Sequence, residues 1–253
     1  VDPNKLARAN DWAARVFQKN LSDDEKGKTA REYLEQRHIS DESIEKWRIG
    51  LADGQQNSLT EYAQKLDVPP DLLEKAGLAV RYSGGSYRDK FINRLMFPIT
   101  DVTGRVIAFG GRTLVDDAAK YMNSPTTALF DKSNALYGLE QARHEIGSQN
   151  CAIVVEGYTD VIMAHQFGIT NVVATLGTSF TAGHARTLKR YAGKLVLMFD
   201  TDVAGTEAAN RALEICLSRQ IDIKLAFVPE GKDPCDFLLS AGADKFREII
   251  DSA

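Results

Sequence analysis

Apolar residues follow helical spacing over the first third of the chain. Near the N-terminus, Ala9, Ala13 and Phe17 recur every three or four positions and form one apolar stripe, which predicts an amphipathic helix. Ser22 and Glu25 have the spacing of a capping box, so we expect the next helix to begin there. These helices hold no combination of residues typical of a reaction centre, and we interpret them as scaffold.

Short apolar runs broken by turn residues follow from Leu78. The runs LMFPI and RVIAFGG flank the segment TDVTG, which predicts a hairpin that turns at Gly104. A helix is predicted over residues 136–147. The segment GSQN, residues 147–150, consists of turn-forming residues and is the predicted domain boundary.

Beyond this boundary, apolar runs alternate with helical segments. The runs AIVVEG, NVVATLG, KLVLMFD and IKLAFV are apolar throughout instead of alternating with polar residues. Such strands are typical of parallel sheets whose two faces are covered by helices. The predicted fold class is therefore mixed α/β. We expect an α+β subdomain over residues 1–147, a parallel-sheet domain over 148–230, and an acidic loop with the start of a helical subdomain over 231–253.

Composition excludes several classes of protein. No apolar run approaches the roughly 20 residues that a membrane span needs, and no export leader is present, so we expect a cytoplasmic protein without membrane contact. The three cysteines are far apart and no Cys/His cluster accompanies them, which excludes a structural zinc site. The net charge is −4, and only residues 81–147 hold more basic than acidic side chains. Since the chain opens at Val1 rather than Met, we expect a fragment or a processed product.

Acidic residues follow three of the predicted strands at the point where each strand ends. Glu156 and Asp160 follow the first, Asp200 and Asp202 the third, and Asp233 lies in the loop after the fourth. Ligands bind outside the carboxyl ends of parallel strands, so we expect these acids to converge. Like charges within about 4–6 Å disfavour each other's ionised form, and a hard divalent cation relieves this conflict. For Asp202 alone, the alternative is an ordinary helix N-cap.

Several motifs together resemble known proteins. The segments VVEGYTD, LMFDTDVAG and GKDP resemble the topoisomerase–primase (Toprim) domain, whose hallmark is a strand-end Glu plus an Asp-x-Asp. The preceding segments FINRLMFPI, GRVIAFGGR, KYMNSP and LYGL resemble, in that order, the N-terminal part of the catalytic core of DnaG-type bacterial primases. The resemblance covers most of residues 1–240. It implies a DNA-directed RNA polymerase of the bacterial cytoplasm that makes short RNA primers for DNA replication.

The resemblance also assigns roles to the acids. It implies that Glu156, Asp200 and Asp202 are the catalytic acids, and that Asp160 and Asp233 join them in holding Mg²⁺ or Mn²⁺. The implied reaction is attack of a 3′-hydroxyl on the α-phosphorus of a ribonucleotide by two-metal catalysis. Glu156 has two open roles, as a metal ligand or in proton transfer.

The last acidic loop departs from the family pattern. The family often has Asp-Pro-Asp there, whereas this chain has Cys235 where the second Asp is common, followed by Asp236. A thiol is a poor Mg²⁺ ligand. We therefore leave open whether Asp236 replaces the missing carboxylate.

The basic side of the site is expected in the middle of the chain. Arginine forks suit phosphate oxygens and an aromatic ring can stack on a base. For each lysine alone, a solvated surface charge is the alternative. The residues that the motifs mark for binding nucleic acid or nucleotide are Arg94, Arg112, Lys120, Tyr121, Asn123, Ser124 and Lys132.

The resemblance implies partners and leaves two rivals. The implied partners are a single-stranded DNA template, ribonucleoside triphosphates, the RNA primer, and a replicative helicase bound through a C-terminal domain that this segment lacks. We expect the core to be a monomer without zinc. One rival is a haloacid-dehalogenase-like phosphohydrolase, because DTDVAG fits its nucleophile loop, although that loop normally opens its domain. The other is a Toprim protein that binds single-stranded DNA without catalysis.

Overall fold

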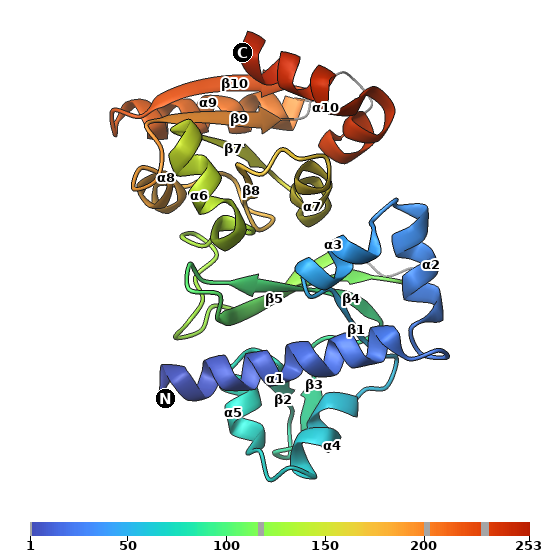
Figure 1. Ribbon diagram of the computed structural model, residues 1–253. Coiled ribbons are helices and arrows are strands. Elements are labelled where there is room, and N and C mark those ends of the chain that lie inside the picture. The colour runs from blue at the N-terminus through green and yellow to red at the C-terminus, as the bar shows by residue number, and fades with distance from the viewer. Residues whose placement is uncertain (1, 116–118, 200–202, 229–232) are drawn as a thin grey trace. The chain divides into compact units, whose positions relative to one another are not determined.

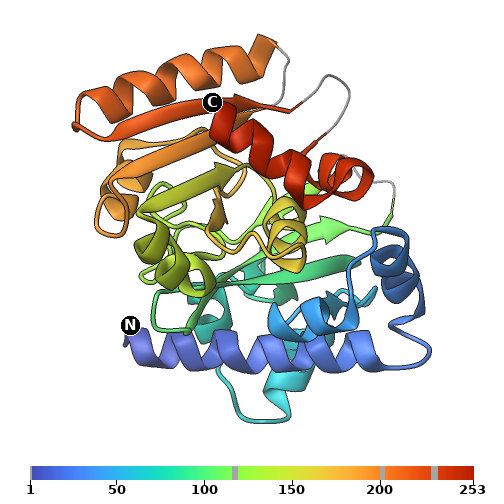
Figure 2. The same cartoon turned by 45° about the horizontal axis from the view of Figure 1, so that its top comes forward.

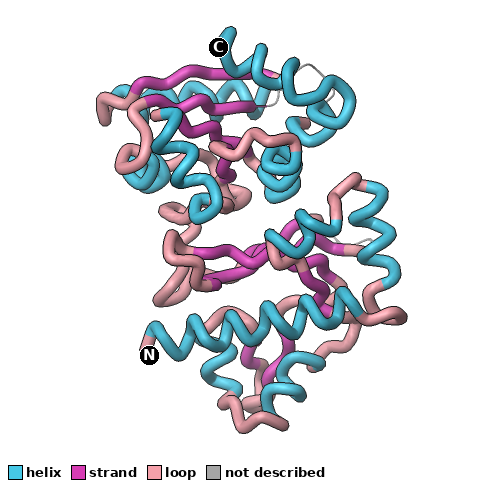
Figure 3. The backbone as a smooth tube through the Cα atoms, in the orientation of Figure 1, coloured by secondary structure: helices cyan, strands magenta, loops and turns pink. Residues whose placement is uncertain are grey.

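The chain folds into two units that contain helices and strands in different arrangements. The computed structural model describes residues 2–115, 119–199, 203–228 and 233–253. Backbone contacts divide the chain into unit 1, Val1–Asp131, and unit 2, Lys132–Ala253 (Figures 1 and 3). The three-part division expected from the sequence stays a prediction. Among the described helices, none has the length and apolar character that crossing a membrane requires.

Unit 1 is built on an antiparallel sheet that packs on a long helix. The strands of this sheet, in the order β1-β4-β5-β6, are β1 (Gly50–Ala52), β4 (Arg94–Thr100), β5 (Val106–Thr113) and β6 (Tyr121–Asn123). Helix α1 (Pro3–Ser22) lies along one face, as Figure 1 shows. Its Phe17 ring meets the Phe109 ring of β5 edge to face, with centroids 5.4 Å apart. This contact identifies the face of the sheet that is buried against α1.

Smaller elements complete unit 1. They are α2 (Lys28–Gln36), α3 (Asp41–Lys46), α4 (Ser58–Gln64), α5 (Pro70–Lys75) and the two-stranded sheet of β2 (Ala79–Arg81) and β3 (Tyr87–Asp89). One apolar core includes Leu59 of α4, Leu73 of α5 and the α1 stripe that contains Ala9 and Phe17. The predicted amphipathic helix near the N-terminus is therefore confirmed.

The predicted helix start at Ser22 is wrong. Helix α1 continues through Ser22, and α2 begins only at Lys28. In the intervening turn, Asp23 accepts the hydrogen bonds instead. Its Oδ1 accepts from the N–H of Glu25 at 3.1 Å and from the N–H of Lys26 at 3.0 Å. Since the Ser22 hydroxyl donates to a carbonyl within α1, it does not cap a second helix.

The predicted hairpin is confirmed. Strands β4 and β5 pair antiparallel, with Phe97 opposite Gly110, and Gly104 takes the positive φ of 84° that the turn requires. Asp101 organises the turn, since its carboxylate accepts from the N–H of Thr103 at 2.9 Å and from Arg105 Nε at 2.8 Å. Burial acts to raise the pKa of Asp101, but these hydrogen bonds outweigh it and leave the pKa below its usual value.

Unit 2 contains the predicted parallel sheet. Its strands, in the order β10-β9-β7-β8, are β7 (Cys151–Val155), β8 (Val172–Ala174), β9 (Lys194–Phe199) and β10 (Asp222–Phe227). The helices are α6 (Leu139–Gln149), α7 (Tyr158–Gln166), α8 (Ala182–Leu188), α9 (Val203–Leu217) and α10 (Pro234–Ser252). Helices α6 and α9 lie on opposite faces of the sheet (Figures 1 and 2). Residues 147–149, part of the predicted boundary, form the last turn of α6.

Candidate functional site

The carboxyl ends of the parallel strands form one edge of the sheet in unit 2. Val154 of β7 lies opposite Leu197 of β9. Glu156, two residues after Val154, therefore lies at the same height along the sheet as Phe199, the last residue of β9. Glu156 is exposed at this edge. Asp200 and Asp202, which follow β9 in the sequence, lie outside the described residues. Their convergence with Glu156 therefore stays a prediction.

Asp160 joins two acidic segments that are distant in the sequence. Its side chain is buried near the start of α7, where Oδ2 accepts from the N–H of Gly157 at 3.0 Å. Its other oxygen, Oδ1, accepts from the N–H of Cys235 at 3.2 Å. This carboxylate therefore holds the turn that contains Glu156 beside the start of α10, where the loop containing Asp233 ends.

Three potential metal ligands gather at the start of α10. Asp233 is the N-cap of this helix and accepts from the N–H of Asp236 at 2.7 Å. One ligand atom from each of Asp233, Cys235 and Asp236 lies within 4.8 Å of the others. The two carboxylates suit a hard divalent cation, whereas the buried Cys235 thiol is a softer donor. The donor set fits Mg²⁺ or Mn²⁺ through its oxygens, with Asp236 close enough to contribute.

The strand register of unit 1 separates the predicted basic-side residues onto two faces. Arg112 of β5 lies directly opposite Tyr121 of β6, and Gly110 lies opposite Asn123. Because directly opposed residues point to the same side of a sheet, Arg112, Tyr121 and Asn123 share one face. Phe109, the neighbour of Gly110, points to the other face and packs on α1. All three predicted residues remain partly accessible, and Lys120 is exposed beside them.

Arg94 and Ser124 lie on the face toward α1 and are buried. The Nη1 of Arg94 donates to the carbonyl of Gly111 at 3.3 Å and to that of Ala119 at 3.0 Å. The hydroxyl of Ser124 accepts from the N–H of Phe109 at 3.0 Å. These bonds hold the two side chains against the backbone of Gly111, Ala119 and Phe109. The structure therefore does not bring Arg94 and Ser124 onto the face of Arg112. Their roles in binding nucleic acid stay predictions.

Tyr33 of α2 and Arg37, the C-cap that follows this helix, were missed by the sequence analysis. The guanidinium carbon of Arg112 lies 4.1 Å from the ring centroid of Tyr33, and that of Arg37 lies 5.6 Å from the same centroid. The sequence signal was present, since Tyr33 and Arg37 are four positions apart and therefore share one face of a helix. Without the contact to Arg112, this pair was indistinguishable from scaffold.

Lys132 belongs to unit 2 and its side chain is exposed. Its backbone carbonyl lies 2.9 Å from Nε2 of the buried His184, while Nδ1 of the same ring accepts from the N–H of Thr181 at 3.2 Å. A proton on Nε2 satisfies both bonds. The backbone at Lys132 is thus anchored, and the role of its ammonium group stays a prediction.

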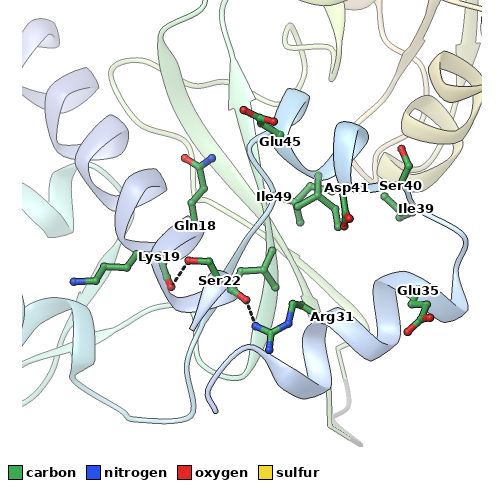
Figure 4. Close-up of a pocket in the computed structure, with 12 residues that line it drawn as sticks. Gln18, Lys19, Ser22, Arg31, Glu35, Ile39, Ser40, Asp41, Glu45 and Ile49 are labelled. Carbon is green, nitrogen blue, oxygen red and sulfur yellow. Dashed lines mark hydrogen bonds between the residues drawn. The ribbon is translucent and has the colours of Figure 1, made fainter. Parts of the chain in front are cut away.

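A cavity of about 970 Å³ lies within unit 1 between α1, α2 and α3 (Figure 4). Lys19, Arg31, Glu35 and Glu45 line it, and the Arg31 guanidinium is occupied by backbone carbonyls, among them that of Leu21 at 2.6 Å. Among the site residues predicted from the sequence and described by the structure, none lines this cavity.

Two family models match the chain over the two parts just described. "DNA primase catalytic core, N-terminal domain" matches residues 16–143, and "Toprim-like" matches residues 153–238. The chain belongs to the DnaG primase family. The resemblance and the mixed α/β fold class expected from the sequence are thereby confirmed. The comparisons give no support to the phosphohydrolase or to a non-catalytic Toprim protein.

Named relatives are similar over nearly the whole chain. A DNA primase of Halalkalibacterium halodurans is 42% identical over 250 residues, which are 98% of this chain and 42% of the relative. The DNA primase of Escherichia coli is 41% identical over 229 residues, which are 89% of this chain and 39% of the relative. This DnaG-family chain thus spans less than half the length of these curated relatives.

Solved structures of DnaG cores share the fold. The RNA polymerase domain of Mycobacterium tuberculosis primase DnaG superposes with a TM-score of 0.91 at 35% identity, covering 98% of this chain and 83% of that one. A DnaG primase catalytic domain bound to single-stranded DNA also gives 0.91, at 36% identity, covering 99% of this chain and 81% of that one. The chain therefore has the fold of DnaG primase cores.

Proposed function

We propose that this chain is a catalytic core that makes short RNA primers on a single-stranded DNA template. The observation that carries the proposal is the Asp160 carboxylate, which holds the Glu156 turn and the start of α10 together at the edge where the Toprim acids are expected. Family membership supports the same reaction, since the similar proteins are named DNA primases and one solved relative is described as bound to single-stranded DNA.

The acidic edge of unit 2 is assigned to the reaction centre. Glu156, Asp200, Asp202 and Asp233 would hold Mg²⁺ or Mn²⁺, which supplies Lewis-acid activation of a hydroxyl and neutralises triphosphate charge. Glu156 is exposed at the end of β7, and in this proposal it would ligate the cation or take a proton from the attacking 3′-hydroxyl. Asp160 is committed to two backbone N–H groups, so it acts mainly by holding the other acids in place.

The β6 end of the sheet face that holds Arg112 is assigned to the polyanionic partners. Arg112 offers a planar fork of N–H donors to phosphate oxygens, and Tyr121 offers a ring on which a base can stack. Asn123 lies on the same face and offers hydrogen bonds to sugar or base edges. With Lys120 and Lys132, these groups bind template DNA and ribonucleoside triphosphates in our proposal.

The remaining partners follow from the same assignment. The RNA primer is the product, and the replicative helicase would be bound through a further domain of the longer family members. We propose that the core acts as a monomer in the bacterial cytoplasm.

The decisive variant is Asp200→Ala. It should reduce primer synthesis from ribonucleotides by roughly 100-fold or more while leaving the dissociation constant for single-stranded DNA within about twofold, because only the metal ligand is lost. The matched control is Asp222→Ala, which removes an exposed carboxylate from the opposite end of the same sheet. Normal synthesis by Asp200→Ala would overturn the assignment, and equal losses in both variants would show a general effect of charge.

A further inference from the structure

Tyr33 gathers two positive charges at one aromatic ring. The guanidinium of Arg112 comes from β5 and that of Arg37 from the C-cap of α2, at 4.1 Å and 5.6 Å from the ring centroid. Cation–π attraction offsets part of the repulsion between the two guanidiniums.

Arg112 keeps hydrogen-bonding capacity that the fold does not use. Its Nη1 donates to the carbonyl of Thr113 at 3.2 Å, while its buried Nε has no hydrogen-bond partner among the described residues. No described carboxylate forms an ion pair with it either. A guanidinium has five N–H donors in one plane. Because Nε is buried, the terminal N–H groups that are not bonded to Thr113 are the ones that remain for an incoming ligand. Phosphate is the anion whose geometry matches this fork.

We propose that Tyr33 is a positioning residue of the nucleic-acid surface. Its ring fixes the plane of the Arg112 guanidinium, so that the fork faces the phosphates of single-stranded DNA instead of turning among many rotamers. The proposal rests on the proposed function, because it presumes that Arg112 binds the template. Tyr33 need not touch the DNA, since it acts through Arg112.

The aromatic ring, and not the hydroxyl, carries this role. Tyr33→Phe keeps the ring face, whereas Tyr33→Met fills similar space on a helix without a π-system. A matched control is Tyr62→Met, which removes another accessible tyrosine of unit 1, one whose ring lies beside Trp12 with centroids 5.7 Å apart. Should Tyr33→Met fail to fold, Tyr33→Gln takes its place, because glutamine has a comparable helix preference.

The test is binding of fluorescein-labelled oligothymidylate by the whole chain, followed by anisotropy over a series of salt concentrations. We expect Tyr33→Met to weaken binding about fivefold and to reduce the slope of log Kd against log salt by about 0.7, the value for one lost phosphate contact on a single strand. Tyr33→Phe and Tyr62→Met should stay within about twofold of the wild type. A loss in Tyr33→Phe as large as that in Tyr33→Met would overturn the role of the ring.

A double-mutant cycle separates positioning from mere structural support. On an Arg112→Ala background, Tyr33→Met should cost less than about twofold further, because the group it positions is gone. Full additivity would overturn the proposal, as would normal binding by Tyr33→Met where Arg112→Ala alone weakens binding. Normal binding by Arg112→Ala would also reject the template role of this sheet face in the proposed function.

Discussion

The two units present charge in opposite ways. In unit 2 the described acids follow parallel strands, and the contact of Asp160 with the start of α10 brings together two segments that are distant in the sequence. In unit 1 the cations and aromatic residues lie on a sheet face, alternating along the same strands with residues that pack on α1. The residues of a site at the sheet edge are set by where the strands end. The residues of a site on a sheet face are set by the side of the sheet to which each side chain points. The first is readable from a sequence, and the second requires the register.

Hydrogen bonding follows the same division. Acids of unit 2 accept from backbone N–H groups, as Asp160 and Asp233 do. Cations of unit 1 are held by backbone carbonyls and by a ring, as Arg94 and Arg112 are. In both units the backbone orients the charged side chains and leaves some of them able to bind a ligand of opposite charge.

The largest effect is expected from breaking the junction at Asp160. Asp160→Ala removes the acceptor of two backbone N–H groups in a buried place, and we expect a loss of about 3 kcal/mol in the free energy of unfolding together with loss of primer synthesis. Urea unfolding measures the first and ribonucleotide incorporation the second. Unchanged stability would show that the carboxylate does not hold the edge together.

Next in size is Arg94→Met, which tests the buried face of unit 1. We expect about 2 kcal/mol of destabilisation, because the carbonyls of Gly111 and Ala119 lose a charged donor. Binding of single-stranded DNA by the folded variant should change by less than about twofold. Urea unfolding and anisotropy provide the two values, and strong loss of binding without loss of stability would place Arg94 on the DNA surface.

Tyr121→Ala tests the accessible face. Tyr121 is 39% exposed, so loss of its ring should leave stability nearly unchanged while weakening oligothymidylate binding about fivefold, through lost stacking. Ser124→Ala is the matched control on the same short segment, since its side chain points to the other face. If Ser124→Ala weakened binding more than Tyr121→Ala, the division into two faces would fail.

The smallest effect is expected at Asp101 of unit 1, which forms an ion pair with Arg105. The pKa of Asp101 lies below its usual value, so its ionised form stabilises the fold above pH 4, near the unfolded pKa, and this contribution is lost as pH falls through the lowered folded pKa. Asp101→Asn should lower Tm by about 2 °C at pH 7 and by less at pH 3. Thermal melts at the two pH values measure this difference, and an equal or larger gap at pH 3 would contradict the sign.

Sequence reasoning reached the parts of the site that depend on local pattern. The apolar runs identified the parallel strands, and the acid directly after β7 followed from that reading. The faces of Arg94 and Ser124 were not readable, because the β4–β5 register decides the first and the β5–β6 register the second. Tyr33 was out of reach for a similar reason: its contact to Arg112 joins a helix and a strand far apart in the chain. The Ser22 capping box failed because neighbouring Asp23 takes the N–H groups of the turn.

The central claim is that acids from separate strand ends share divalent cations. Its most direct measurement is anomalous diffraction from crystals of this chain soaked in Mn²⁺. The account predicts density about 2.2 Å from carboxylate oxygens of Glu156, Asp200 and Asp202, the distance expected for hard cations on oxygen ligands. Absence of density there at saturating Mn²⁺, with these carboxylates turned apart or paired with lysine or arginine, would contradict it.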